Sequence, residues 1–121
     1  IITANSPVLY ERDITKLNTV FAYVEKNYNR KISLKKAASV INFSCSYFSR
    51  YFKKATGRTF KDYLIFVRIC EVEKLIFSGR MNVSQAAYEA GFSNISSFNR
   101  AFKRVRGYSP REIVRSKTAK Y

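Results

Sequence analysis

Apolar side chains recur three or four positions apart along most of the chain, which is the spacing of one face of a helix. The first stripe of this kind comprises Ile14, Leu17, Val20, Phe21, Val24 and Tyr28. Asp13 lies just before the stripe, where its carboxylate can accept hydrogen bonds from the first free backbone N–H groups of a helix. We therefore predict a helix that begins after Asp13. Residues 1–12 show no such period and contain Pro7, so we interpret them as an incoming linker.

Six further helices are predicted by the same spacing together with residues that begin or end helices. Their ranges are 33–41, 44–56, 59–78, 82–90, 94–106 and a short last helix from 109. The expected N-caps are Ser33, Ser44, Asn82, Asn94 and Ser109, since short polar side chains bond to the first N–H groups of a helix. Left-handed turns are expected at Asn42, Gly57, Gly79, Gly91 and Gly107.

The composition agrees with a helical fold, because 46% of the residues are apolar and there are only four Gly and two Pro. We expect an all-α protein of seven helices that form two helix-turn-helix subdomains joined by a long linker helix. The expected divisions are a linker from a preceding domain (1–12), a first subdomain (13–58), a connecting helix (59–79) and a second subdomain (80–121).

The second subdomain repeats the first almost position by position. The offset is 49 residues up to Phe43 and Phe92, and 50 residues from Ser44 and Asn94 onward, so Ser93 is a single insertion in a turn. The apolar and glycine identities are Ala37/Ala86, Ala38/Ala87, Phe43/Phe92, Phe48/Phe98, Phe52/Phe102 and Gly57/Gly107. A duplicated helical hairpin needs these pairs for packing and turns, so they indicate the fold and say nothing of function.

The remaining identities are polar and need a different explanation. They are Ser46/Ser96, Arg50/Arg100 and Lys53/Lys103. Helical spacing places them opposite the apolar face, together with Ser49 and Asn99. An outward face of Ser, Asn, Arg and Lys is typical of a recognition helix that enters a DNA major groove. On such a helix we expect the arginines to contact bases and the lysines, one turn further on, to contact phosphates.

The positive charge is concentrated in the two repeats. The formal net charge is +15, yet residues 1–29 and 59–93 each balance their bases and acids. Residues 30–58 hold eight bases and no acid, and residues 94–121 hold eight bases against Glu112. A polyanionic partner with two separate points of attachment fits this distribution better than an ordinary mixed surface.

Several classes of protein are disfavoured by the same sequence. It has no apolar run near 18 residues and no secretory signal at its start, so we expect a cytoplasmic protein with no membrane partner. Cys45 and Cys70 lack metal-ligand spacing and there is no His, so we expect no metal site, no cofactor and no disulfide framework. No Gly-rich phosphate loop or nucleophile with a base is present, which argues against an enzyme.

The chain resembles the AraC/XylS family of bacterial transcription regulators over residues 14 to 115. In the second repeat the matching positions are Ala87, Gly91, Phe92, Phe98, Arg100, Phe102, Lys103, Gly107, Ser109 and Pro110. In the first repeat and the connecting helix they are Phe48, Phe52, Lys53, Lys54, Gly57, Tyr63, Leu64 and Arg68. The chain departs from the family at Val72, where a small Ala is usual, and at Ile113-Val114, where Tyr-Arg is common, so a polymerase or phosphate contact there is not carried over.

The resemblance implies two helix-turn-helix units that reach successive major grooves of double-stranded DNA. The expected base contacts are Ser46, Tyr47, Ser49 and Arg50 in the first repeat and Ser96, Ser97, Asn99 and Arg100 in the second. The expected phosphate contacts are Ser44, Lys53, Lys54, Asn94, Lys103 and Arg104.

Other partners follow from the resemblance alone. RNA polymerase is a candidate partner, activation is the expected mode of regulation, and a homodimer is expected to form through a domain that precedes residue 1. Two alternatives remain open at this point: a cationic protein of membrane surfaces and an RNA-binding protein.

Overall fold

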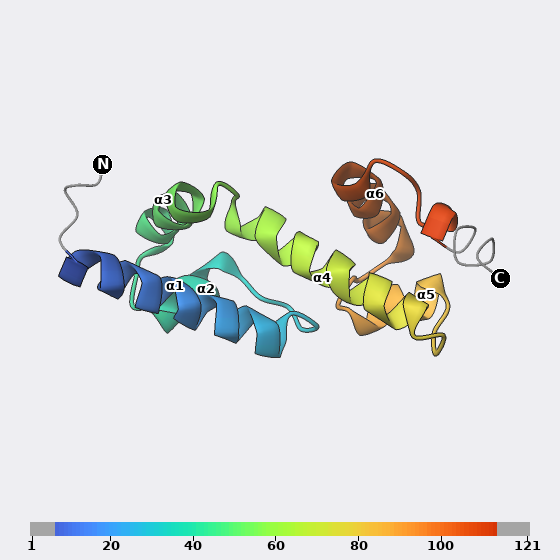
Figure 1. Cartoon of the computed structure of the whole chain (residues 1–121), viewed down its shortest axis with the longest axis horizontal. Helices are drawn as coiled ribbons and strands as arrows, with labels where there is room; N and C mark the ends of the chain where they lie inside the picture. Colours follow the sequence, from blue (N-terminus) through green and yellow to red (C-terminus); the bar gives the residue numbers. More distant parts are fainter. Residues whose placement is uncertain (1–6, 114–121) are drawn as a thin grey trace. The chain divides into compact units, whose positions relative to one another are not determined.

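The structure is a computed structural model that describes the backbone of residues 7–113 and the side chains of residues 14–113 (Figure 1). Over this range the backbone forms six helices and the start of a seventh, with no strand. The helices are α1 (Pro7–Asn27), α2 (Leu34–Val40), α3 (Cys45–Thr56), α4 (Phe60–Phe77), α5 (Val83–Glu89) and α6 (Ile95–Arg106). Residues 111–113 form the described part of the last helix. The expected all-α fold of seven helices is therefore confirmed.

The start of α1 differs from the prediction. The helix begins at Pro7, so Asp13 lies within it and the prediction that Asp13 caps it is wrong. Proline suits the first helical turn, because the N–H groups there have no acceptor within the helix and the ring fixes φ near the helical value. The apolar stripe that guided the prediction begins only at Ile14, about two turns later, and so could not reveal the true start.

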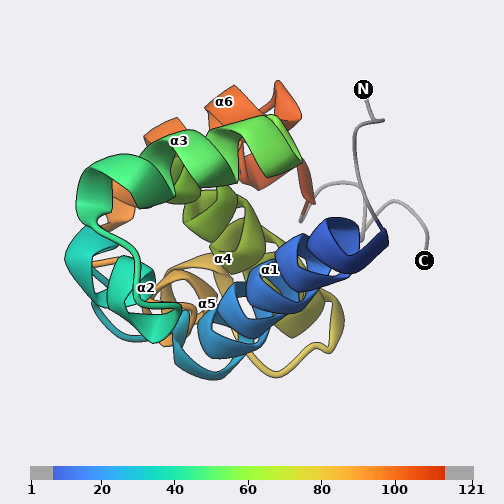
Figure 2. The same ribbon diagram turned by 90° about the vertical axis from the view of Figure 1, so that its left-hand side faces the viewer.

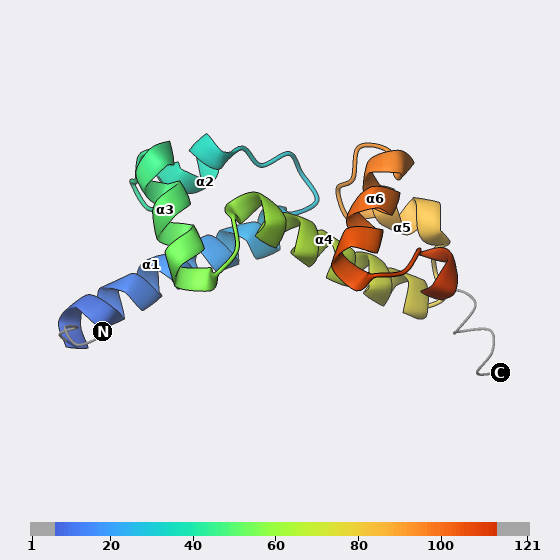
Figure 3. The same ribbon diagram turned by 90° about the horizontal axis from the view of Figure 1, so that it is seen from above.

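The described residues divide into two compact units. The first contains residues 7–27 and 32–61, and the second contains residues 28–31 and 62–113. In the first unit α2 packs against both α1 and α3 (Figure 2). In the second unit α5 and α6 lie side by side (Figure 3). All of α4 from residue 62 onward belongs to the second unit, so most of the predicted connecting helix is part of that unit's core.

Aromatic rings from three helices form the core of the first unit. Phe48 and Phe52 of α3 are fully buried. The ring of Phe52 meets the ring of Phe21 edge-on, with centroids 6.2 Å apart, and that of Phe60 edge-on at 5.5 Å. Edge-to-face pairs of this kind are favoured by the ring quadrupole. Further buried side chains are Val20, Val24, Ala37, Ala38 and Ile41.

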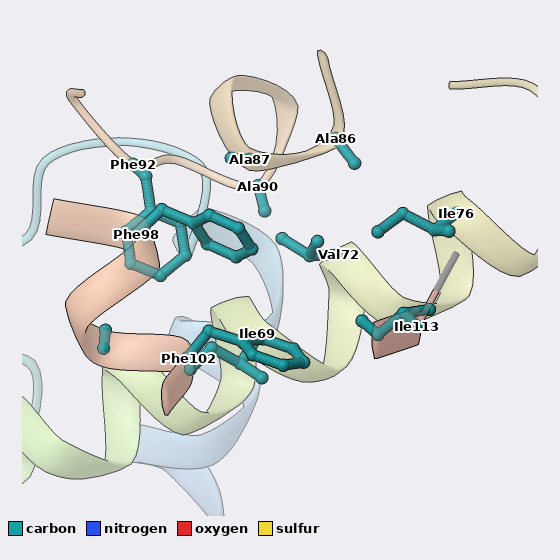
Figure 4. Packing of buried hydrophobic residues seen from close by; sticks show 11 residues of the cluster. Ile69, Val72, Ile76, Ala86, Ala87, Ala90, Phe92, Phe98, Phe102 and Ile113 are labelled. Carbon is teal, nitrogen blue, oxygen red and sulfur yellow. The ribbon is translucent and has the colours of Figure 1, made fainter. Parts of the chain in front are cut away.

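The second unit buries the equivalent rings against the middle and end of α4 (Figure 4). Phe98 and Phe102 of α6 are fully buried, and their centroids are 5.7 Å apart. The other members of the cluster are Ile69, Val72, Ile76, Ala86, Ala87, Ala90, Phe92, Ala101 and Ile113. Val72, which departs from the family pattern, is fully buried in this cluster, so the larger side chain is accommodated within the core.

A short segment between α1 and α2, residues 28–31, belongs to the second unit and is bound by Arg68 of α4. The Nε atom of Arg68 donates to the carbonyl oxygen of Tyr28 at 2.7 Å, and Nη2 donates to that of Arg30 at 2.8 Å. Gly91 lies against the same place with φ +109°, and a Cβ atom there would come within 2.6 Å of the Tyr28 oxygen and 2.9 Å of Arg68 Nε. The position therefore requires glycine for both conformation and space.

Replacing Phe52 or Phe102 by Ala is expected to lower the free energy of unfolding by about 3–5 kcal/mol, because each truncation leaves a cavity in a core. Phe77→Ala is the control, since the Phe77 side chain is 56% exposed. Thermal melts followed by circular dichroism give the comparison. A Phe102→Ala protein with the same melting temperature as wild type would show that the inward face of α6 is assigned wrongly.

Gly91→Ala is expected to destabilise the protein more than Gly107→Ala does. Both residues have positive φ, which costs an alanine about 1–2 kcal/mol. Only Gly91 also has backbone within contact distance, and such overpacking adds about 1–3 kcal/mol. Chemical unfolding of the two variants measures the difference. Equal losses would mean that the segment at Tyr28 moves away at no cost.

Candidate nucleic-acid interface

Matched caps give α3 and α6 the same length of 12 residues. Ser44 Oγ accepts the N–H of Tyr47 at 3.2 Å, and Asn94 Oδ1 accepts the N–H of Ser97 at 2.7 Å. Both helices end at a left-handed glycine, Gly57 or Gly107, whose N–H donates to the carbonyl four residues earlier at 2.8 Å. The predicted N-caps and glycine ends of these helices are confirmed. The cap oxygens of Ser44 and Asn94 are already occupied within the protein, and their contact with phosphate stays a prediction.

The turns before α3 and α6 have the same hydrogen bond in spite of the inserted Ser93. The N–H of Phe43 donates to Ala38 O at 3.0 Å, and the N–H of Phe92 donates to Ala87 O at 3.0 Å. The residue before each Phe has a positive φ, 60° at Asn42 and 109° at Gly91. Ser93 itself is exposed, so the extra residue is accommodated at the surface.

The polar residues predicted on the outer faces are found there. Exposed side chains on α3 are Ser46, Tyr47, Arg50, Lys53 and Lys54, and on α6 they are Ser96, Asn99, Arg100, Lys103 and Arg104. Ser49 and Ser97 are only half-buried, so they lie at the edge of the outer faces. The buried phenylalanines occupy the opposite side of each helix, which confirms the orientation inferred from the spacing.

Tyr47 is the one large aromatic side chain on the outer part of α3, and it is 51% exposed. Its ring packs on Phe43 with centroids 4.7 Å apart. Phe43 in turn meets Tyr51 edge-on at 5.2 Å, and the Nζ atom of Lys16 lies 5.4 Å from the centroid of its ring. These contacts restrict where the Tyr47 hydroxyl can point. The corresponding residue in α6 is Ser97, so the two outer faces differ at this position.

Two arginines near the end of α6 face carboxylates of α4, which the sequence pattern alone did not reveal. Arg106 forms two hydrogen bonds of 2.7 Å to Glu73, one from Nε and one from Nη2, and its Nη2 also lies 3.6 Å from the sulfur of Cys70. The side chains of Arg106 and Glu73 are only 28% and 20% exposed. The hydrogen bonds to Glu73 raise the pKa of the Arg106 guanidinium, because they stabilise its charged form.

The second pair is weaker. Arg104 Nη2 lies 3.7 Å from Asp62 Oδ1, and the two side chains are 62% and 56% exposed. Such an exposed pair contributes little to stability and can rearrange. Its carboxylate nevertheless offsets the charge of Arg104, which was predicted to contact phosphate.

Sequence reasoning also passed over two exposed lysines, Lys35 and Lys36, on α2. Their counterparts on α5 are Ser84 and Gln85. Aligning the two repeats reveals this difference, but the prediction of DNA contacts starts from the positions at which the repeats are identical.

The part of the chain that the structure describes has further features outside the two outer faces. No group of three potential metal ligands comes together among these residues, and none of their helices is long and apolar enough to cross a membrane. An open depression of about 630 Å³ in the second unit is lined by Glu73, Phe77, Lys103, Tyr108, Ser109, Glu112 and Ile113. Both cysteines are free and half-buried.

Comparisons with known proteins agree with this geometry. A family model described as a helix-turn-helix domain matches residues 37–116. An uncharacterized HTH-type transcriptional regulator in the cgkA 5′ region of Pseudoalteromonas carrageenovora is 34% identical over 94 residues, covering 78% of this chain and 55% of the relative. The HTH-type transcriptional activator RhaS of Enterobacter sp. (strain 638) is 29% identical over 109 residues, covering 90% of this chain and 39% of the relative. The chain thus spans about half or less of these relatives.

Solved structures have the same fold. A probable AraC family transcriptional regulator from Rhodopseudomonas palustris CGA009 matches with a TM-score of 0.75 and 25% identity, covering 85% of this chain and 97% of that one. The DNA-binding domain of AdpA, a global transcriptional factor solved in complex with a target DNA, matches with a TM-score of 0.80 and 23% identity, covering 87% and 95%.

Arg106→Gln is expected to lower the free energy of unfolding by about 1–3 kcal/mol, because Glu73 then loses two charge-assisted hydrogen bonds in a half-buried place. Arg104→Gln is the matched control on the same helix and should stay within about 0.5 kcal/mol of wild type, since its pair is exposed. Urea unfolding of both variants makes the comparison. Equal effects would contradict the difference seen between the two pairs.

Proposed function

The chain belongs to the AraC-type helix-turn-helix domain family, and on that basis we propose that it binds double-stranded DNA at specific sequences as part of a bacterial transcription regulator. In this proposal α3 and α6 are recognition helices that enter successive major grooves. The observation that carries the proposal is the pair of matched outer faces. Each presents Ser, Arg and Lys at the same three positions, while the phenylalanines on the opposite side are buried.

The outer faces have the chemistry needed to read bases. An arginine can bond both acceptors on a guanine edge, and an asparagine can do the same with adenine. Arg50 and Arg100 are therefore assigned to guanine, and Asn99 to adenine. Ser46, Ser49, Ser96 and Ser97 are short side chains that can donate to or accept from either kind of base. Tyr47 adds an apolar ring, suited to the methyl group of thymine, in the first unit alone.

The cations at the ends of α3 and α6 are assigned to phosphates. Lys53, Lys54 and Lys103 are exposed and lie about one turn beyond the arginines that read bases. Arg104 joins them if its exposed pair with Asp62 opens on binding. Ser44 and Asn94 cap their helices through oxygen atoms, and the Ser44 hydroxyl and the Asn94 amide NH2 can still donate hydrogen bonds to a nearby phosphate.

The wider role follows the relatives. RhaS is named a transcriptional activator, and we propose activation for this protein, with RNA polymerase and a second copy of the regulator as further partners. The proposed location is the bacterial cytoplasm. Catalysis has no part in the proposal, since the family and its neighbours are transcription regulators.

Replacing Arg50 or Arg100 by Ala is expected to lower affinity by about 1–3 kcal/mol and to relax base preference in one half of the site only. Randomised-site selection with each variant measures this, because the selected sequences show directly which positions lose their preference. The two halves should differ, since Ser49 and Tyr47 accompany Arg50 whereas Asn99 and Ser97 accompany Arg100.

Lys53→Ala and Lys103→Ala are the controls and should weaken binding to all DNA sequences by the same factor. If both arginine variants keep every preferred base, Arg50 and Arg100 bind phosphate and the assignment of base contacts is wrong. If wild-type protein selects no duplex at all, or prefers RNA or anionic vesicles, the proposed function itself fails.

A further inference from the structure

The two units present different surfaces on the helix that precedes each recognition helix. α2 and α5 have the same length of seven residues, begin at a capping Ser33 or Asn82, and bury an Ala pair at equivalent positions. Their outer positions are not equivalent. Lys35 and Lys36 of α2 are exposed, whereas α5 has the exposed, neutral Ser84 and Gln85 in their places.

The difference continues along α5. Ser39 of α2 corresponds to Tyr88, and Val40 corresponds to Glu89, so α5 carries a negative charge where α2 carries none. Tyr88 and Glu89 are both exposed. The surface of α2 is therefore cationic, with a formal charge of +2 from its two lysines, and that of α5 is anionic, with a formal charge of −1 from its one carboxylate.

The recognition helices also differ in the cations near their C-terminal ends. Arg50, Lys53 and Lys54 of α3 are all exposed, and so are Arg100 and Lys103 of α6. On α6 the guanidinium of Arg106 is held in two hydrogen bonds by Glu73, and that of Arg104 lies near Asp62. The two clusters of bases that look alike in the sequence are thus unlike in the folded protein.

From these differences we propose that the first unit makes more contacts with DNA phosphates than the second, with Lys35 and Lys36 as two phosphate contacts that the second unit lacks. The inference rests on the proposed function. In helix-turn-helix proteins the first helix of the motif crosses the DNA backbone while the second lies in the groove. The lysines of α2 are therefore placed to bind phosphate, whereas the neutral residues at the equivalent positions of α5 add no ionic contact. The second unit contributes base contacts but makes fewer ionic contacts with phosphates than the first unit does.

The dependence of binding on salt tests this division, because each phosphate neutralised adds about 0.9 to the slope of log K against log salt. The double variant Lys35→Gln/Lys36→Gln is expected to reduce the slope on a selected duplex by about 1.8, the sum for two contacts. Both side chains are exposed, and a thermal melt establishes that the variant is folded.

Two matched variants of the second unit complete the experiment. Arg104→Gln should change the slope by less than the loss of one full contact, because Asp62 already offsets this charge. Ser84→Lys/Gln85→Lys transfers the lysines of α2 to α5 and should increase the slope by about 1.8. A gain in binding from this variant cannot arise from damage to the fold.

The proposal is overturned if the α2 variant keeps the wild-type slope, or if Arg104→Gln reduces the slope as much as the α2 variant does. If lysines on α5 add nothing, α5 does not lie along the DNA backbone as α2 is proposed to do, and the comparison of the two helices from which the proposal is argued fails. Each of these results leaves the proposed function intact as long as wild-type protein still binds its selected duplex in preference to random DNA. Loss of that preference would instead remove the proposed function.

Discussion

Two buried phenylalanines, one helical turn apart, determine which side of each recognition helix faces outward. Phe48 and Phe52 are fully buried in the first unit, and Phe98 and Phe102 in the second. A helix turns by about 100° per residue, so a shift of one position toward the C-terminus would turn both rings out of the core and bring Lys53 or Lys103 toward it. Burying an unpaired charge costs several kcal/mol, more than the core could recover. The outer faces that we assign to DNA are thus a direct consequence of how the cores pack.

Local features of the fold could be predicted from the sequence because they depend on neighbouring residues. The apolar stripes, the caps at Ser44 and Asn94, and the left-handed turns at Asn42 and Gly91 are set by side chains within a few positions. The start of α1 could not be predicted, because its first turns carry no apolar stripe and Asp13 offered a misleading cap. A residue type that favours the N-cap position can also occur inside a helix, and the sequence alone does not distinguish the two cases.

Contacts between distant residues were beyond the sequence pattern. The hydrogen bonds from Arg68 to Tyr28 and Arg30 join residues about 40 positions apart, and they place the segment after α1 in the second unit. The pairing of Arg106 with Glu73 likewise depends on how α6 packs on α4. The count of bases treated all eight cations of residues 94–121 as equal, and only the folded chain shows that Arg106 is engaged within the protein. The outward orientation of most candidate DNA contacts was predictable, but their availability was not.

Hydroxyl-radical footprinting on a duplex that the protein itself has selected tests the central claim most directly. The claim is that α3 and α6 bind one asymmetric DNA site together. The account predicts two protected stretches on one face of the duplex, centred about one helical turn or roughly 10 base pairs apart. A single protected stretch, or a footprint that competing RNA or anionic vesicles remove as readily as the selected duplex does, would contradict it.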